Sequence, residues 1–146
     1  MPKPPDELAA LAAAQTVGDV LGIEVLEATP ERCVATMPVD ARHHQPFGYL
    51  HGGVSVVLAE TVASVGAYMA APEGYTSFGQ EINANHLRPK RSGTLTATGT
   101  PVYVGRTSQV WGIEITDERG KLVCVSRCTL AIVPVGGKDG RQKAEG

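Results

Sequence analysis

Hydrophobic and polar positions predict a short helix and two strands, then one long apolar helix and four more strands. Residues 6–15 are alanine-rich and begin at Asp6, a good helix N-cap that follows two prolines, which predicts a short helix. Residues 23–27 and 32–38 have strand-like patterns, and the polar, proline-containing residues 28–31 between them favour a hairpin turn.

Residues 54–71 form a long apolar stretch that carries a single charge, at Glu60, and ends before Pro72. As a helix it would be about 27 Å long, nearly the length of a membrane span. We reject a membrane span because two serines, a threonine and the glutamate lie within the segment, and no basic flank accompanies it.

A helix that is apolar on nearly every side must be covered by other elements. The remaining apolar patterns predict four strands, at residues 76–87, 93–104, 108–116 and 122–133. The predicted fold class is therefore α+β, with a curled antiparallel β-sheet wrapped around one long central helix. Such a sheet leaves edge strands that can pair with a second copy, which predicts a homodimer.

The length of 146 residues favours one domain. We expect an N-terminal helix and arm at residues 1–17, the folded domain at 18–134 and a disordered polar tail at 135–146. A hydrophobic content of 42% and a net charge of −2 indicate a soluble protein with no general attraction to nucleic acid or membranes. The N-terminus lacks an apolar signal segment, which favours a cytoplasmic protein.

Three cysteines in no short spacing argue against a disulfide framework and favour a reducing compartment. Cys124 and Cys128 lie on one predicted strand, about 13 Å apart, so we expect buried core thiols. The four histidines show no metal-ligand spacing, and we expect no metal. The chain also lacks the G-x-S-x-G motif of serine hydrolases and the glycine-rich motifs of nucleotide sites.

The loop before the long helix ends in His51, Gly52 and Gly53. Unpaired N–H groups at a helix N-terminus, with the positive end of the helix dipole behind them, form a potential oxyanion site. The alternative is that the two glycines only make a tight turn into the helix. Local sequence alone favours neither interpretation.

Glu60 is a lone carboxylate in an apolar helix, and no Lys or Arg occurs between Arg42 and Arg88 to pair with it locally. We therefore expect a buried carboxylate whose pKa is raised by desolvation. Ser64 lies four residues later on the same helix face and could orient the carboxylate or a water molecule. Together with the N–H site, these groups suggest attack on a carbonyl. The alternatives are an exposed carboxylate and one paired with a distant basic group.

Basic residues gather in two loops. Arg88, Lys90 and Arg91 follow His86, and Arg106 precedes Thr107 and Ser108 in the next loop. If the loops lie side by side, they could hold phosphate groups. A solvated charge run is an equally good interpretation.

Two sequence segments resemble those of hotdog-fold acyl-CoA thioesterases of the phenylacetate-degradation type. The first is Gln45 to Gly53 followed by Leu58-Ala59-Glu60, and the second is Gly79 to His86. The similarity covers residues 18–133, nearly the whole predicted domain. It implies a hotdog fold and hydrolysis of an acyl-CoA, with an aromatic acyl group such as 1,4-dihydroxy-2-naphthoyl, hydroxybenzoyl or phenylacetyl.

The resemblance also implies roles for individual residues. The residues at the reacting thioester would be Glu60 as nucleophile or general base, the Gly52 N–H as oxyanion donor, and Gln45, His51 and Ser64 as positioning groups. The residues that bind the rest of the substrate and CoA would be His86, Arg88, Arg106, Thr107 and Gly79. The site would be shared between two subunits of a homodimer that pairs into a homotetramer, with no cofactor because CoA is part of the substrate. A non-catalytic acyl-CoA-binding module of the same fold is the alternative function.

Overall fold

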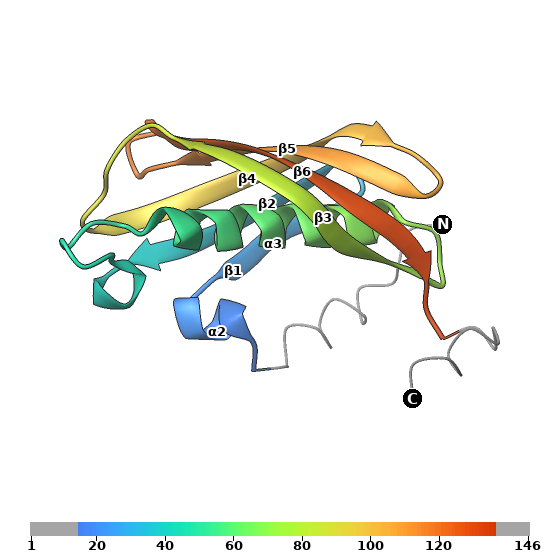
Figure 1. The fold of residues 1–146 in the computed structure, drawn as a ribbon, viewed down its shortest axis with the longest axis horizontal. Helices are drawn as coiled ribbons and strands as arrows, with labels where there is room; N and C mark the ends of the chain where they lie inside the picture. Colours follow the sequence, from blue (N-terminus) through green and yellow to red (C-terminus); the bar gives the residue numbers. More distant parts are fainter. Residues whose placement is uncertain (1–14, 137–146) are drawn as a thin grey trace.

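The computed structural model describes residues 15–136, which form one curled antiparallel sheet and a long helix that crosses its concave side (Figure 1). The elements in chain order are α2 (Val17–Leu21), β1 (Glu24–Thr29), β2 (Arg32–Val39), the 3-10 helix η1 (Ala41–His43), α3 (Gly52–Ala70), β3 (Tyr75–His86), β4 (Gly93–Val104), β5 (Ser108–Thr116) and β6 (Leu122–Pro134).

The six strands follow the order β1-β2-β4-β5-β6-β3, and every neighbouring pair is antiparallel. β1 and β3 are therefore the two edges of a sheet that does not close on itself. β3 is an edge strand of 12 residues, and most of its side chains are at least partly exposed. This long edge lies beside α3, where the predicted chemistry is concentrated.

Small residues allow α3 to pack closely on the sheet. A methyl group at Gly66 would lie 2.5 Å from Cζ3 of Trp111, and one at Gly99 of β4 would lie 2.6 Å from a methyl of Val62. Trp111 is fully buried, and its Nε1 donates a hydrogen bond to Gln109 Oε1 at 2.8 Å. These close contacts explain why so many residues of the central helix are alanine or glycine.

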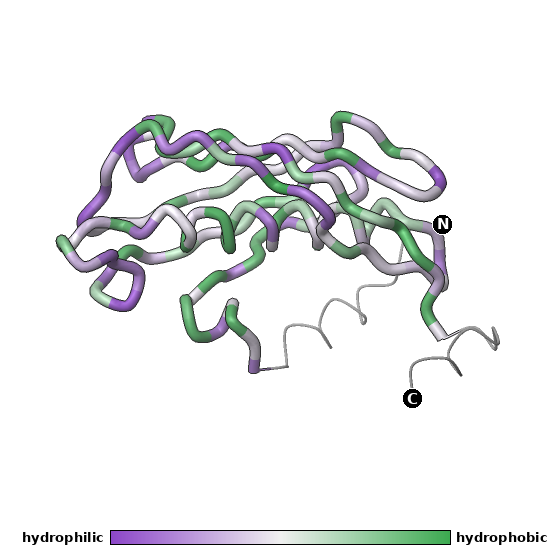
Figure 2. The backbone as a smooth tube through the Cα atoms, viewed as in Figure 1, coloured by the Kyte–Doolittle hydropathy of each residue, from purple (hydrophilic) through white to green (hydrophobic). Residues whose placement is uncertain are grey.

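The helix α3 is, among the described residues, the only one long and apolar enough to cross a membrane. It is the core helix of this domain, because Leu58, Ala59, Val62 and Ala63 are fully buried beneath the sheet. In Figure 2 α3 is mostly pale or green, whereas the loops around residues 40–44 and 88–91 are largely hydrophilic. The apolar stretch is thus explained by packing inside the domain.

The predicted elements correspond closely to the observed ones, although η1 was not predicted and several element ends differ by one or two residues. β1 runs from Glu24 to Thr29, so the turn is shorter than predicted, and the Thr29 hydroxyl oxygen accepts the Arg32 N–H there at 3.0 Å. The helix α3 begins at Gly52, two residues earlier than predicted. The five-residue helix α2 was not predicted. The helix expected at residues 6–15 and the tail from residue 137 lie outside the described residues, apart from Gln15.

Candidate active site

The N-terminus of α3 leaves one backbone donor available. His51 is the N-cap residue, and its Nδ1 accepts the N–H of Gly53 at 2.8 Å. The next two N–H groups, of Val54 and Ser55, bond to the His51 carbonyl oxygen. Within residues 15–136, no group accepts the Gly52 N–H. This N–H therefore lies free at the positive end of the helix dipole, where it can bind a ligand oxygen.

The imidazole of His86 lies directly against Gly52. A methyl group at Gly52 would be 2.7 Å from Nε2 of His86, so any larger residue there would force the ring to move. His86 is the last residue of the edge strand β3, and the strand brings it to the helix terminus from 34 positions away in the sequence. The structure thus joins two of the predicted site residues at the free N–H.

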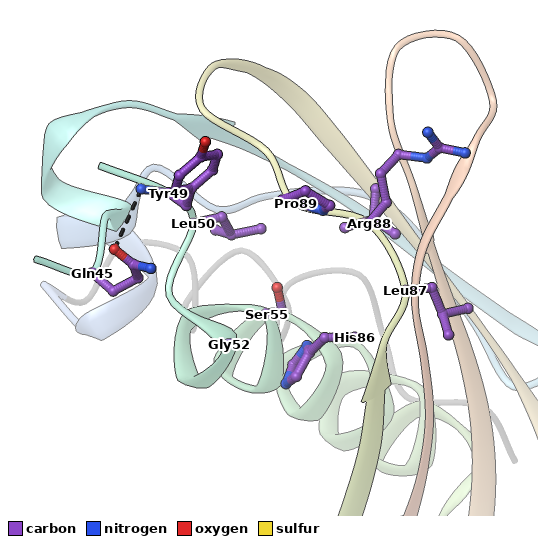
Figure 3. A pocket seen from close by; sticks show the side chains of 10 residues that line it. Gln45, Tyr49, Leu50, Gly52, Ser55, His86, Leu87, Arg88 and Pro89 are labelled. Atoms are coloured by element: carbon purple, nitrogen blue, oxygen red, sulfur yellow. Dashed lines mark hydrogen bonds between the residues drawn. The ribbon is translucent and has the colours of Figure 1, made fainter. Parts of the chain in front are cut away.

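A cavity of about 490 Å³ opens at the same place (Figure 3). Its lining comes from the loop before α3, the first turn of α3, the loop after β3 and the start of β6. The lining residues are Gln45, Tyr49, Leu50, Gly52, Ser55, His86, Leu87, Arg88, Pro89 and Val123. Apolar side chains form much of the wall, and Gly52 and His86 lie at one end of it.

The Gln45 side chain is held by the tight turn that follows it. Its Oε1 accepts the N–H of Phe47 at 2.5 Å and that of Tyr49 at 3.5 Å. Figure 3 draws the second of these bonds. The Gln45 N–H in turn bonds to the Tyr49 carbonyl oxygen at 2.7 Å. These bonds fix the carboxamide at the cavity and leave its NH₂ group for other contacts.

Two loops that border the cavity are fastened together. The Arg91 guanidinium lies 4.4 Å from the centre of the Tyr49 ring, and it donates a hydrogen bond to the Tyr49 hydroxyl at 2.8 Å. His44 Nε2 donates to the Arg91 carbonyl oxygen at 2.7 Å, and the Leu50 N–H bonds to the Lys90 carbonyl oxygen at 2.8 Å. This contact between Tyr49 and Arg91 could not be predicted, because residues 42 positions apart leave no local pattern in the sequence.

Glu60 lies beside the edge strand and not in this cavity. Its carboxyl group is packed on Gly79 of β3, where a methyl group would be 3.0 Å from Cδ of Glu60. Glu60 is half-buried, so the predicted full burial is wrong for the single chain. The reason is the sheet order, because β3 is the last strand and, among residues 15–136, no further strand covers the helix beyond it. In the part of the chain that the structure describes, Glu60 forms no ion pair.

Gly79 was assigned by resemblance to substrate binding, and the structure places it against the Glu60 carboxyl group. Ser64 lies one helical turn beyond Glu60 and is half-buried. Its carbonyl oxygen accepts a hydrogen bond from the Ser77 hydroxyl of β3 at 2.8 Å, which ties the edge strand to α3. The positioning role of the Ser64 hydroxyl stays a prediction.

The two basic loops lie at opposite ends of one chain, so the expectation that they could lie side by side is wrong within a subunit. The Leu87 N–H bonds to the Val123 carbonyl oxygen, and the Ile132 N–H bonds to that of Thr107. Nine residues of β6 separate these two contacts, a distance of about 30 Å along an extended strand. Arg106 is exposed at the β4–β5 end, whereas Arg88 lines the cavity.

Among the described residues, the cysteines and histidines do not form a group of metal ligands. Cys33, Cys124 and Cys128 are free and buried, as predicted for core thiols. His43 is fully buried, and its Nε2 donates to the Leu21 carbonyl oxygen at 2.7 Å, which joins η1 to α2. Within the described range no three metal-binding side chains come together.

Comparison with known proteins identifies the family. Residues 47–124 match the family model of the thioesterase superfamily. The chain belongs to the thioesterase superfamily. This confirms the predicted class of enzyme, an acyl-CoA thioesterase.

Relatives and solved structures agree with this family. The ComA2 protein of Bacillus subtilis is 55% identical over 81% of this chain and 94% of its own. A 1,4-dihydroxy-2-naphthoyl-CoA hydrolase of Listeria monocytogenes is 50% identical over 78% of this chain and 93% of its own. The crystal structure of a Haemophilus influenzae thioesterase is similar with a TM-score of 0.85 and 46% identity, covering 95% of this chain and 97% of that one. The predicted hotdog fold is confirmed.

Proposed function

We propose that this thioesterase hydrolyses an aromatic acyl-CoA to the free acid and CoA in a homodimer. In each active site, the Gly52 N–H of one subunit and Glu60 of the partner subunit act on the same thioester. The chain needs no cofactor, because CoA enters as part of the substrate. We further propose that the dimers pair into a homotetramer and that the protein works in the cytoplasm.

The separation of Gly52 and Glu60 along α3 is the main observation that supports a site shared between two subunits. They are eight positions apart, which is about 12 Å along the axis of the helix. One thioester carbonyl cannot contact both groups of a single chain, since attack needs the reacting atoms about 3 Å apart. A second subunit can supply the missing carboxylate, and the outer edge of β3 beside Glu60 offers backbone groups of residues 76–86 for that contact.

The chemistry follows from the groups at the site. The Gly52 N–H stabilises the negative charge that develops on the thioester oxygen. Glu60 attacks the carbonyl carbon or removes a proton from a water molecule that does so, and Ser64 orients it. The C–S bond then breaks, and the CoA thiolate leaves and takes up a proton. If water is the attacking group, the free acid forms in this step. If Glu60 is the attacking group, a water molecule hydrolyses the anhydride between Glu60 and the acyl group, which releases the free acid and restores the carboxylate. Because Nδ1 of His51 accepts the Gly53 N–H, only Nε2 of His51 is available to the substrate.

Binding of CoA requires local positive charge, since the chain has a net charge of −2. Arg88 stands at the cavity with His86, and Arg106 and Thr107 stand at the far end of the same subunit. All four residues can contact one CoA molecule only if Arg88 and Arg106 come from different subunits. The aromatic acyl group is supported by the apolar cavity walls and by the similarity to the Listeria hydrolase named for 1,4-dihydroxy-2-naphthoyl-CoA.

The test is release of free thiol from benzoyl-CoA, phenylacetyl-CoA and 1,4-dihydroxy-2-naphthoyl-CoA. Replacing Glu60 by Gln is expected to lower kcat about 100- to 10,000-fold, because it removes the base or nucleophile. Glu114→Gln is the matched control, since Glu114 is exposed on β5. Full activity of Glu60→Gln would contradict the assigned role. Tight binding of an acyl-CoA without hydrolysis by the wild type would support the binding-module alternative.

Mixing two inactive variants tests the shared site. Glu60→Gln and Gln45→Ala each damage a different half of the proposed site. If the halves come from different subunits, unfolding and refolding the two variants together creates mixed dimers with one intact site. Activity of the mixture well above that of either variant is expected, and a mixture no more active than its parts would refute the shared site.

A further inference from the structure

Ser55 carries a buried hydroxyl group that has no partner. It lies in the first turn of α3, its side chain is 1% exposed, and no described group accepts or donates a hydrogen bond at Oγ. Its own N–H already bonds to the His51 carbonyl oxygen at 3.4 Å. A buried polar group without a partner destabilises a protein, so the hydroxyl does not help the free chain to fold.

The same hydroxyl belongs to the wall of the cavity at the helix terminus. Ser55 lines the cavity together with Gly52, and Figure 3 shows its oxygen directed from α3 toward Leu50 and Pro89. The neighbouring wall at Leu87 and Val123 is apolar. Ser55 thus places a buried hydrogen-bonding group next to the apolar part of the cavity wall, which is the arrangement of a selective ligand pocket.

We propose that Ser55 is a specificity-determining residue that hydrogen-bonds an oxygen substituent on the acyl group of the substrate. This inference rests on the proposed function, in which the Gly52 N–H holds the thioester carbonyl. Ser55 follows Gly52 by three residues, about 4.5 Å along the helix axis. That spacing matches a substituent on a ring attached to the carbonyl and not the carbonyl oxygen itself. Hydroxyaryl thioesters are therefore preferred over the unsubstituted ones.

The experiment compares kcat/KM for benzoyl-CoA and for its 2-, 3- and 4-hydroxy derivatives. The wild type is expected to prefer at least one hydroxy isomer by about 10- to 100-fold, because a pocket with a fixed polar group discriminates against a ligand that leaves it unpaired. Ser55→Ala is expected to abolish this preference mainly by losing activity on the hydroxylated substrate. Its melting temperature is expected to stay the same or rise, since the variant removes an unpartnered buried hydroxyl.

Ser126→Ala is the matched control. Ser126 on β6 is the other described residue with a buried hydroxyl that lacks a partner, and it does not line this cavity. It should keep the wild-type preference among the four substrates. The same loss of preference in both serine variants would indicate a general effect of serine removal and would overturn the assignment.

Three further results would also overturn it. The first is a wild type with no preference for any hydroxy isomer, and the second is a Ser55→Ala variant that keeps the preference. The third is an equal loss on all four substrates, which would place the hydroxyl against the pantetheine part that they share. If the wild type hydrolyses none of them, the proposed aromatic thioesterase activity fails. The affinities of wild type and of Ser55→Ala for the four acyl-CoA compounds are then compared by titration calorimetry. Equal affinities in the two proteins refute the Ser55 assignment on its own.

Discussion

Replacing Gly79 by alanine should damage catalysis while leaving the fold intact. A methyl group at this position would lie 3.0 Å from Cδ of Glu60 and closer still to Oε1. Carbon atoms in contact normally stay about 3.5–4.0 Å apart, so the carboxyl group must move by roughly 0.5–1 Å. It can do so because it is the end of a flexible, half-buried side chain.

The expected size of the effect follows from this displacement. Moving a catalytic group by about 1 Å can cost about 100-fold in rate, so we expect Gly79→Ala to lower kcat by about 10- to 100-fold. The free energy of unfolding should change by less than about 1 kcal/mol, because alanine is at least as favourable as glycine in a strand. Thiol release measures kcat, and urea unfolding measures stability.

The control is Gly112→Ala in β5, where the nearest atom to an added methyl is in Val102 at an ordinary distance of 3.5 Å. It should keep full activity. In the double variant Gly79→Ala with Glu60→Gln, the Gly79 change should add no further loss, because it acts through Glu60. Unchanged kcat in Gly79→Ala, or an added loss in the double variant, would refute the placement of Glu60 at the reacting thioester.

Three further predictions concern stability and thiol chemistry. Gly66→Ala should lower the free energy of unfolding by about 1–3 kcal/mol, because its methyl group would overlap the Trp111 ring. Urea unfolding measures this, and an unchanged unfolding midpoint would contradict the packing. Burial raises the pKa of the Cys33 thiol to about 12, so a thiol reagent at pH 8 should label it only after unfolding, and rapid labelling of the native protein would contradict this. The Asp117 carboxylate accepts a hydrogen bond from the Lys121 N–H at 2.9 Å, which holds the pKa of the carboxyl below its usual value. Asp117→Asn should therefore destabilise the protein near neutral pH. This stability gap should shrink as acid protonates the wild-type carboxylate through its lowered pKa, and a gap independent of pH would refute the argument.

Much of the fold could be predicted because each long element has its own hydrophobic pattern. β4 and β5 occupy the predicted residues, and α3 differs mainly at its start, where Gly52 and Gly53 already belong to the helix. The helix α2 is five residues long and too short to show a periodic pattern. It is held instead by Asp19, which accepts the Thr16 N–H at 3.0 Å, and by Gly22, whose φ of 71° ends it.

The site was harder to predict because its geometry depends on strand order. The residue types at the helix terminus and at Glu60 were recognisable, but their environments were not. Glu60 is only half-buried because β3, the strand beside it, pairs with β6 on one side and forms the edge of the sheet on the other. Arg88 and Arg106 lie in successive loops of the sequence, yet β4 carries the chain across the whole sheet between them. Ser55 stood out only as a polar residue in an apolar helix, and its missing partner is visible only in three dimensions.

The open edge and the spacing along α3 have a common physical explanation. A single helix can offer an oxyanion donor only at its N-terminus, whereas a carboxylate at mid-helix is about 12 Å away. If the sheet closed around α3, Glu60 would lose water with no cation in the core to pair with it, at a large cost in free energy. An open edge at β3 keeps the carboxylate hydrated in the free subunit. In the proposed dimer, the same edge brings that carboxylate to the helix terminus of the other chain, where it meets the bound thioester.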